Sequence, residues 1–385
     1  MRRFALFDYG FRPFFLAAGL EAMLVMAVWQ TVYFRPEAWP STPLPASLWH
    51  AHEMVFGFAS AAIAGFLLTA VPNWTGAKGY SGGSLIALVL IWLAGRIAML
   101  PWLAMQAPIA AAIDLAFFPA LAGVLAFPLV RAGKVRNLPF LLLLALLFVA
   151  NALFHFANPT TGLMLAVDVI LILVVVIGGR IIPAFTQTGL RQSGVEISIR
   201  AAPALEAISI GAAALVLIGD LLPIDRGNNG LIAAVAALAH AVRLARWRGS
   251  KTLRFPLLWS LHAGYAWIVV AFALKAAWML LDAPFAAKWL HALTIGTFGT
   301  MILAVMTRSS LGHTGRPLKV AKAISVAYLL VSVAAFVRVL GPSLVPSDYG
   351  LTIASSGICW LVAFLLFLWI YAPILVTPRA DGKPG

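Results

Sequence analysis

The sequence has 385 residues, of which 62% are hydrophobic and only 10% charged, and this balance excludes an ordinary soluble domain. The net charge of +14 does not indicate nucleic-acid binding, because the basic residues lie in short gaps between apolar runs rather than on one polar face. The composition therefore predicts an all-α, polytopic helical bundle in a lipid bilayer, with no nucleic acid as partner.

Taken in chain order, the apolar runs predict about twelve transmembrane helices, since a helix needs about 20 apolar residues to cross the hydrocarbon core. Turn-forming pairs such as Gly82-Gly83 and Asn158-Pro159 separate the runs. No polar linker is long enough to divide the chain, so residues 1–385 are expected to form a single integral membrane domain. The predicted spans are 11–34, 50–71, 82–102, 108–131, 137–157, 161–183, 204–223, 228–247, 255–281, 286–307, 318–340 and 350–375.

The distribution of basic residues predicts the orientation of the bundle. Most of the 27 Lys and Arg residues fall in the terminal segments, in the even-numbered loops or at the helix ends beside them. Because cytoplasmic loops are rich in Lys and Arg, both termini are expected on the cytoplasmic side.

Two short patterns indicate how the helices are organised. His52, Gly57 and Thr75-Gly76 match His291, Gly296 and Thr314-Gly315 without gaps, which is either a trace of duplication or a coincidence. The segment 178–186, Gly-Gly-Arg-Ile-Ile-Pro-Ala-Phe-Thr, ends the sixth predicted span and is interpreted as close helix packing, with a gate as the alternative.

Four of the seven histidines are expected near the outer face in the predicted topology. His50 and His52 lie in the first turn of the second span, His155 in the last turn of the fifth, and His291 about 8 Å below the outer end of the tenth. His50 and His52 are about 200° apart on a helix, so they suit two different centres better than one. The alternatives are an interfacial position for His50 and a helix-end hydrogen bond for His155.

Ionisable residues inside spans are expensive and are therefore candidates for a site. Glu53, Asp114, Asp168 and Lys275 are expected in the same outer portion of the bundle, where they can orient ligating imidazoles or hold cofactor propionates. Neutral imidazole binds haem iron, copper and zinc. With Cys359 as the single cysteine, the pattern favours b-type haem or copper over iron–sulfur chemistry and excludes covalent haem attachment through paired cysteines.

At these residues the chain resembles the NnrS family of bacterial membrane proteins. The segments that carry the resemblance extend over nearly the whole chain and are Gly10-Phe11-Arg12-Pro13-Phe14-Phe15, Trp49-His50-Ala51-His52-Glu53-Met54, Val71-Pro72-Asn73-Trp74-Thr75-Gly76, Gly179-Arg180-Ile181-Ile182-Pro183, His291-Ala292-Leu293, Met306-Thr307-Arg308 and Gly312-His313-Thr314-Gly315. The resemblance implies a multi-pass protein of the bacterial inner membrane that contains haem and copper and is linked to nitric oxide metabolism and resistance to nitrosative stress.

The resulting hypothesis places a haem or copper centre, ligated by His52, His291, His50 or His155, where nitric oxide or a related small ligand binds. A redox centre would also need an electron donor, which the sequence does not identify. The main alternative is a proton-coupled secondary transporter in which the same His, Asp, Glu and Lys residues form a proton relay. A membrane scaffold without a cofactor is a third interpretation, and the sequence does not predict turnover of a substrate.

Overall fold

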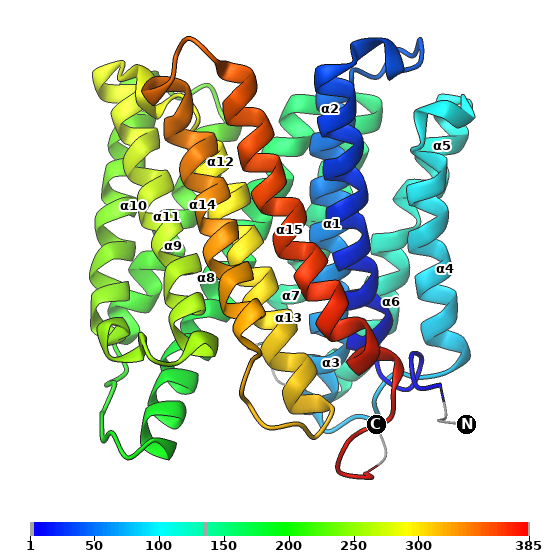
Figure 1. Ribbon diagram of the computed structural model, residues 1–385, viewed down its shortest axis with the longest axis vertical. Helices are drawn as coiled ribbons and strands as arrows, with labels where there is room; N and C mark the ends of the chain where they lie inside the picture. The colour runs from blue at the N-terminus through cyan, green and yellow to red at the C-terminus, as the bar shows by residue number, and fades with distance from the viewer. Residues whose placement is uncertain (1–3, 134–136, 384–385) are drawn as a thin grey trace. The chain divides into compact units, whose positions relative to one another are not determined.

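The computed structural model describes residues 4–133 and 137–383, and within these ranges the chain forms helices and no strands (Figure 1). Among the described residues, eleven helical segments are long and apolar enough to cross a membrane, and α4 (Gly83–Ala98) is a shorter apolar helix in the place of the third predicted span. The predicted all-α membrane bundle is thus confirmed. Both the orientation and the single domain over 1–385 stay predictions, and residues 1–3, 134–136 and 384–385 of that domain lie outside the described ranges.

Two compact units make up the fold. The first contains residues 1–166, 306–318 and 364–385, and the second contains 167–305 and 319–363. Helices wholly in the first unit are α1 (Phe11–Phe34), α2 (Ala46–His52), the π-helix η2 (Glu53–Ala59), α3 (Ser60–Thr75), α4, α5 (Ala107–Leu115), α6 (Phe117–Arg131) and α7 (Pro139–Phe156). Helices wholly in the second are α9 (Pro203–Leu221), α10 (Arg226–Arg246), α11 (Pro256–Leu281), α12 (Trp289–His291), the π-helix η7 (Ala292–Gly299) and α14 (Lys322–Leu344). Helices that contribute residues to both units are α8 (Pro159–Gln192), α13 (Thr300–His313) and α15 (Tyr349–Val376).

Most helices begin and end close to the predicted limits, and the exceptions have local causes. The third predicted span, 82–102, ends early as α4 because Pro101 starts a separate 3-10 turn, η3 (Pro101–Leu103). At 1.5 Å per residue α4 is about 24 Å long, less than the thickness of about 30 Å of a typical hydrocarbon core. The sixth predicted span continues beyond residue 183 to Gln192, with Pro183 inside the helix.

The glycine segment in α8 is a site of close packing, as interpreted from the sequence. A Cβ atom on Gly179 would collide with the guanidinium of Arg243 from α10 and would lie 2.7 Å from a carboxylate oxygen of Glu206 from α9. Arg243 also donates a hydrogen bond to the Val175 carbonyl on α8, at 3.0 Å. Three helices of the second unit therefore meet at this glycine because it has no side chain.

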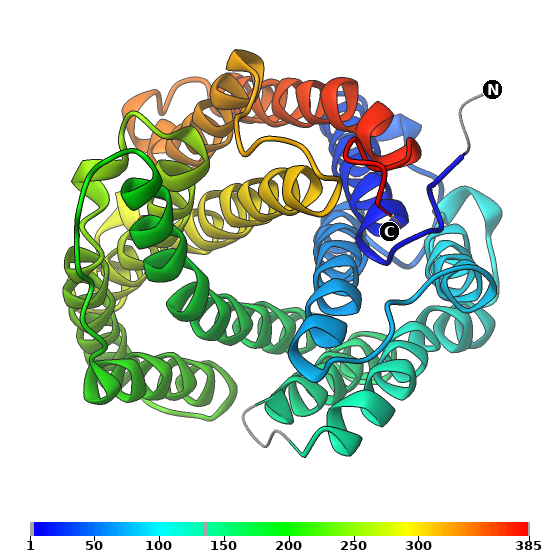
Figure 2. The same cartoon turned by 90° about the horizontal axis from the view of Figure 1, so that it is seen from below.

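In the first unit, α1 packs against α3 and η2, and Figure 2 shows α1 and α3 side by side. Arg12, near the start of α1, is fully buried. Its guanidinium donates hydrogen bonds to the carbonyl oxygens of Leu375 at 2.9 Å and Thr377 at 2.7 Å, at the end of α15. These carbonyls have no partner within their own helix, so Arg12 acts as a C-terminal cap from a distant part of the chain.

The repeated pattern in the sequence has a structural counterpart. His52 and His291 are each the last α-helical residue before a π-helix, and Gly57 and Gly296 lie inside η2 and η7. Gly76 and Gly315, which follow the next helices, both have left-handed backbone, with φ of 73° and 67°. Residues 46–76 and 289–315 thus contain the same succession of local structures.

Candidate metal centre

His52 is the central residue of a buried polar cluster in the first unit. It closes α2, and its ring is fully buried. The Nδ1 atom lies 2.8 Å from Oε1 of Glu53, and Nε2 lies 3.0 Å from Oδ1 of Asn151 and 3.2 Å from Oδ2 of Asp114. Both ring nitrogens therefore face oxygen atoms, and these contacts hold the ring in one orientation.

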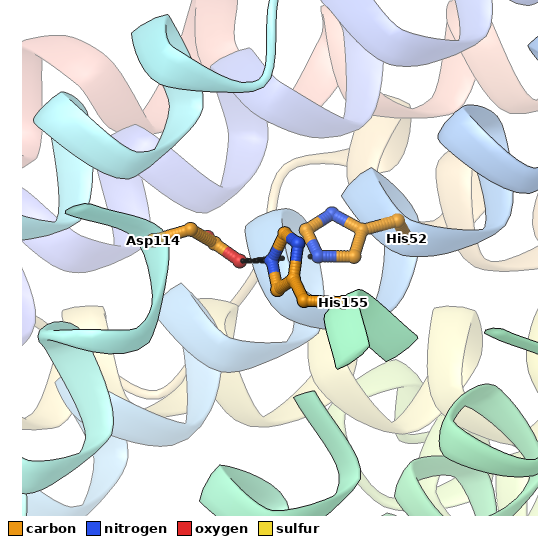
Figure 3. Close-up of side chains that lie close together, drawn as sticks. All are labelled: His52, Asp114 and His155. Carbon is orange, nitrogen blue, oxygen red and sulfur yellow. Dashed lines mark hydrogen bonds and ion pairs between the residues drawn. The ribbon is translucent and has the colours of Figure 1, made fainter. Parts of the chain in front are cut away.

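Asp114 and His155 bring two more ligand atoms to the same place. Asp114 comes from α5 and His155 from the last turn of α7, and His155 Nε2 lies 2.9 Å from Asp114 Oδ2. Figure 3 shows the three side chains converging from three separate helices. Ligand atoms of His52, Asp114 and His155 all lie within 4.8 Å of one another, which makes the group able to hold a metal ion.

The spacing suits a metal of ordinary size. Metal–nitrogen bonds of about 2.0–2.1 Å place neighbouring ligand atoms of a tetrahedral site about 3.3 Å apart. The Asp114 oxygen lies 3.2 Å from the His52 nitrogen and 2.9 Å from the His155 nitrogen, close to this spacing, and all three ligand atoms lie within 4.8 Å of one another. Glu53 would then accept the remaining N–H of His52, in the carboxylate–histidine–metal arrangement that fixes a ligand's orientation.

Arg96 joins the two carboxylates of the cluster. This α4 side chain is buried, and it donates to Glu53 Oε1 at 2.6 Å and to Asp114 Oδ1. Since Arg96 takes the other oxygen of Asp114, Oδ2 stays directed at the imidazoles. The guanidinium balances one of the two carboxylate charges, and the other is left to the imidazoles or to a bound cation.

The π-helix η2 and Gly57 allow this cluster to form. A Cβ atom on Gly57 would lie 2.8 Å from a carboxylate oxygen of Glu21 and 3.3 Å from Cδ of Arg96, so a larger residue would push these side chains away. The Gly57 carbonyl accepts a hydrogen bond from the indole of Trp92 at 3.3 Å. π-Helical turns are often found at functional sites, because they leave carbonyls without their usual partners.

Of the residues predicted for the site, the structure brings together His52, Glu53, Asp114 and His155. Their role as ligands or supporting groups stays a prediction. His50 instead stacks on Trp29, with ring centroids 4.8 Å apart.

The other predicted residues, His291, Asp168 and Lys275, belong to the second unit. His291 precedes η7, and Lys275 pairs with Asp220. Two further histidines of this unit have partners that favour packing roles: His240 Nδ1 lies 2.7 Å from the Tyr265 hydroxyl, and His262 Nε2 lies 2.9 Å from the Thr186 hydroxyl.

Reasoning from the sequence missed Arg96 and Asn151. Asn151 lies in the apolar run of α7, and its amide donates to Asp114 Oδ2 at 2.8 Å while its oxygen faces His52. Arg96 lies inside the third predicted span, 82–102, and is not among the candidate residues named for the site. In both cases the available signal was a polar side chain within an apolar helix, which usually faces the interior of a bundle.

Comparison with known proteins supports the resemblance noted in the sequence. No match was found among curated proteins. A family model described as NnrS protein matches residues 5–379, which is nearly the whole chain. On this evidence the chain belongs to the NnrS family, and membership supports a membrane protein related to nitric oxide.

Proposed function

We propose that this protein binds a copper ion at His52, Asp114 and His155 in the bacterial inner membrane, and that the occupied centre binds nitric oxide. The observation that carries the proposal is the convergence of two imidazole nitrogens and one carboxylate oxygen within 4.8 Å in a buried site. When bound, copper would supply an open coordination position for a small ligand and a change of oxidation state. The protein would act in nitric oxide metabolism or in resistance to nitrosative stress.

The residues around the ligands would tune this centre. Glu53 would keep the proton on Nδ1 of His52 and leave Nε2 for the metal, and Arg96 would hold both carboxylates in place. Burial of the ligands excludes bulk water, which suits an apolar, diatomic ligand that enters from lipid. Two imidazoles and a carboxylate also match iron(II) and zinc, so metal analysis has to identify the ion.

The second predicted cofactor, b-type haem, fits His52 less well than copper does. The His52 ring is fully buried and packs against Phe56 and Phe154, with ring centroids 4.8 and 4.4 Å away, so there is little room for a porphyrin beside it, whereas a single ion needs only the space between the ligand atoms. We therefore assign His52 and His155 to the copper centre and keep His291 and His50 as the candidates for haem ligation.

Metal analysis of the full-length protein, purified in detergent from copper-supplied cells, tests the copper assignment. We expect stoichiometric copper in the natural protein and an electron paramagnetic resonance spectrum of copper(II) with nitrogen ligands that changes when nitric oxide is added. His155→Ala should lose the copper, whereas His262→Ala, which removes a buried histidine of the other unit, should retain it.

Two results would contradict the proposal. One is protein that contains no copper although copper was supplied, and the other is equal copper content in the natural protein and in both histidine variants. If the natural protein contains iron or zinc and only His155→Ala loses it, the metal centre is correct but the bound metal is iron or zinc instead of copper. Absence of all metal, together with a featureless visible spectrum, would favour the proton-coupled transporter.

A further inference from the structure

The second unit contains a separate buried cluster of charged side chains. Lys275 of α11 is fully buried, and its ammonium donates to both carboxylate oxygens of Asp220 from α9. The same ammonium lies 4.7 Å from the centre of the Trp289 ring. Asn229 of α10 adds a hydrogen bond to Asp220 Oδ1 at 3.3 Å. The negative charge of Asp220 is thus balanced by the Lys275 ammonium.

Asp168 of α8 lies in the same electrostatic neighbourhood but has no such partner. Its side chain is 2% exposed. Among the described residues, its Oδ2 atom has no hydrogen-bond partner, and Asp220 and Lys275 are the charged groups that act on it. Its neighbours in the chain, Val167 and Val169, are buried and apolar.

The charges of this cluster do not balance if every group is ionised. Two carboxylates face one ammonium, and that ammonium is already bound by both oxygens of Asp220. An ionised carboxylate with no partner is very costly in a buried, apolar place, and the usual remedy is a proton on the carboxyl group. A hard metal cation would need several oxygen ligands, whereas among the described residues Asp168 belongs to no group of three or more His, Cys, Asp or Glu side chains placed to hold one.

We propose that Asp168 carries an exchangeable proton, and that the adjacent Asp220–Lys275 ion pair sets whether that proton is retained. The proton moves between the Asp168 carboxyl oxygen and water, so its release leaves a carboxylate that competes with Asp220 for the Lys275 ammonium. This proton-binding site belongs to the second unit and is independent of the histidine centre.

Infrared difference spectroscopy of the purified full-length protein, with the pH stepped on an attenuated-reflection cell, tests the proposal. A protonated carboxylic acid has a carbonyl-stretch band distinct from carboxylate bands, and exchange in heavy water shifts it. Asp168→Asn should remove one such band. Asp348→Asn, which alters an exposed aspartate, should leave the band assigned to Asp168 in place, and copper content should be the same in both variants.

Variants of the ion pair give predictions that a merely structural role would not. In Asp220→Asn, Lys275 is free to pair with Asp168, so the acid band should also disappear. In Lys275→Met, both aspartates lose their cation, so a second acid band should appear. These two variants keep the proposal testable even where Asp168→Asn does not fold.

The proposal is overturned if the natural protein and Asp168→Asn have the same acid bands. It is also overturned if the band vanishes on adding sodium chloride but not choline chloride at constant pH, because the site would then hold sodium instead of a proton. If the natural protein contains no copper but shows the acid band, the proposed function is contradicted and the proposal for Asp168 is not.

Discussion

The two π-helical segments, η2 and η7, have similar backbones but different chemistry. Each follows a histidine and has, five residues after that histidine, a glycine that admits a neighbouring side chain. Gly57 makes room for Glu21 and Arg96, whereas Gly296 makes room for the indole of Trp267. The residue after the histidine is Glu53 in the first segment and Ala292 in the second.

The wide turn of a π-helix therefore provides space but does not by itself make a metal centre. The polar cluster at η2 depends on Glu53 and Arg96, which fix one side of the His52 ring and leave the other toward Asp114. At η7 the corresponding space is filled by an aromatic ring. Side chains contributed by other helices therefore decide what each segment can bind.

The largest expected effect is a loss of stability when the positive charge of Arg96, beside η2, is removed. Arg96→Met would leave Glu53 and Asp114 buried without their partner, and loss of one member of a buried ion pair typically costs about 3–5 kcal/mol of unfolding free energy. Thermal or denaturant unfolding in detergent measures the change. The exposed Arg35→Met is the matched control, and equal stability of the two variants would show that the cluster contributes little to the first unit.

The next largest expected effect is a loss of copper affinity when Glu53, which corresponds to Ala292 in the second segment, is replaced. Glu53→Ala gives the first segment the alanine found in the second and removes the group that accepts the His52 N–H. Loss of such a supporting carboxylate typically lowers metal affinity about 10–100-fold. Competition with a copper chelator measures it, with Glu37→Ala as an exposed control. Unchanged affinity would remove Glu53 from the centre.

The glycines at corresponding positions of η2 and η7 allow a matched pair of variants. Gly57→Ala and Gly296→Ala each place a methyl group less than 3 Å from a neighbouring side chain, and overpacking of this kind typically costs about 1–3 kcal/mol. We expect both variants to unfold at lower temperature. Only Gly57→Ala should weaken copper binding, and similar copper loss in Gly296→Ala would mean that the two segments do not act separately.

The smallest expected effect is a slight loss of stability when a helix cap in the second unit is removed. Asp225 caps α10 by accepting the backbone N–H of Asn228 at 3.0 Å, and this hydrogen bond lowers the pKa of the Asp225 carboxyl. The stabilising contribution is present above the unfolded pKa and is lost as the pH falls through the lowered folded pKa.

Asp225→Ala should therefore lower the melting temperature slightly at neutral pH, with a smaller difference in acid and with copper unchanged. Asp225→Asn keeps a good capping group and should stay close to the natural protein at neutral pH. A large loss of copper in either variant would contradict the separation of the two units.

Helix positions were largely predictable from the sequence, because hydropathy and helix length are local properties. The prediction for the first span, 11–34, coincides with α1, and the last, 350–375, differs from α15 by one residue at each end. The two π-helices were not predictable, since no side-chain period distinguishes them from ordinary apolar helix. The repeated histidine and glycine positions were the only trace of them.

The candidate site was predictable in part. His52, Glu53, Asp114 and His155 were grouped because the topology placed them at similar depth. Depth alone did not show that Asp114 turns an oxygen toward both imidazoles, or that Arg96 and Asn151 complete the cluster. Asp220 was likewise missed, because an aspartate at the end of a span looks like an interfacial residue until its contact with Lys275 is seen.

The cap provided by Arg12 has a consequence for biogenesis. Its carbonyl partners at Leu375 and Thr377 lie 363 and 365 residues further along the chain. While the intervening helices are being synthesised and inserted, the guanidinium lacks these partners and has to remain solvated near the lipid headgroups. The first unit contains the earliest helices, but its Arg12 hydrogen bonds can therefore form only after the second unit has entered the membrane.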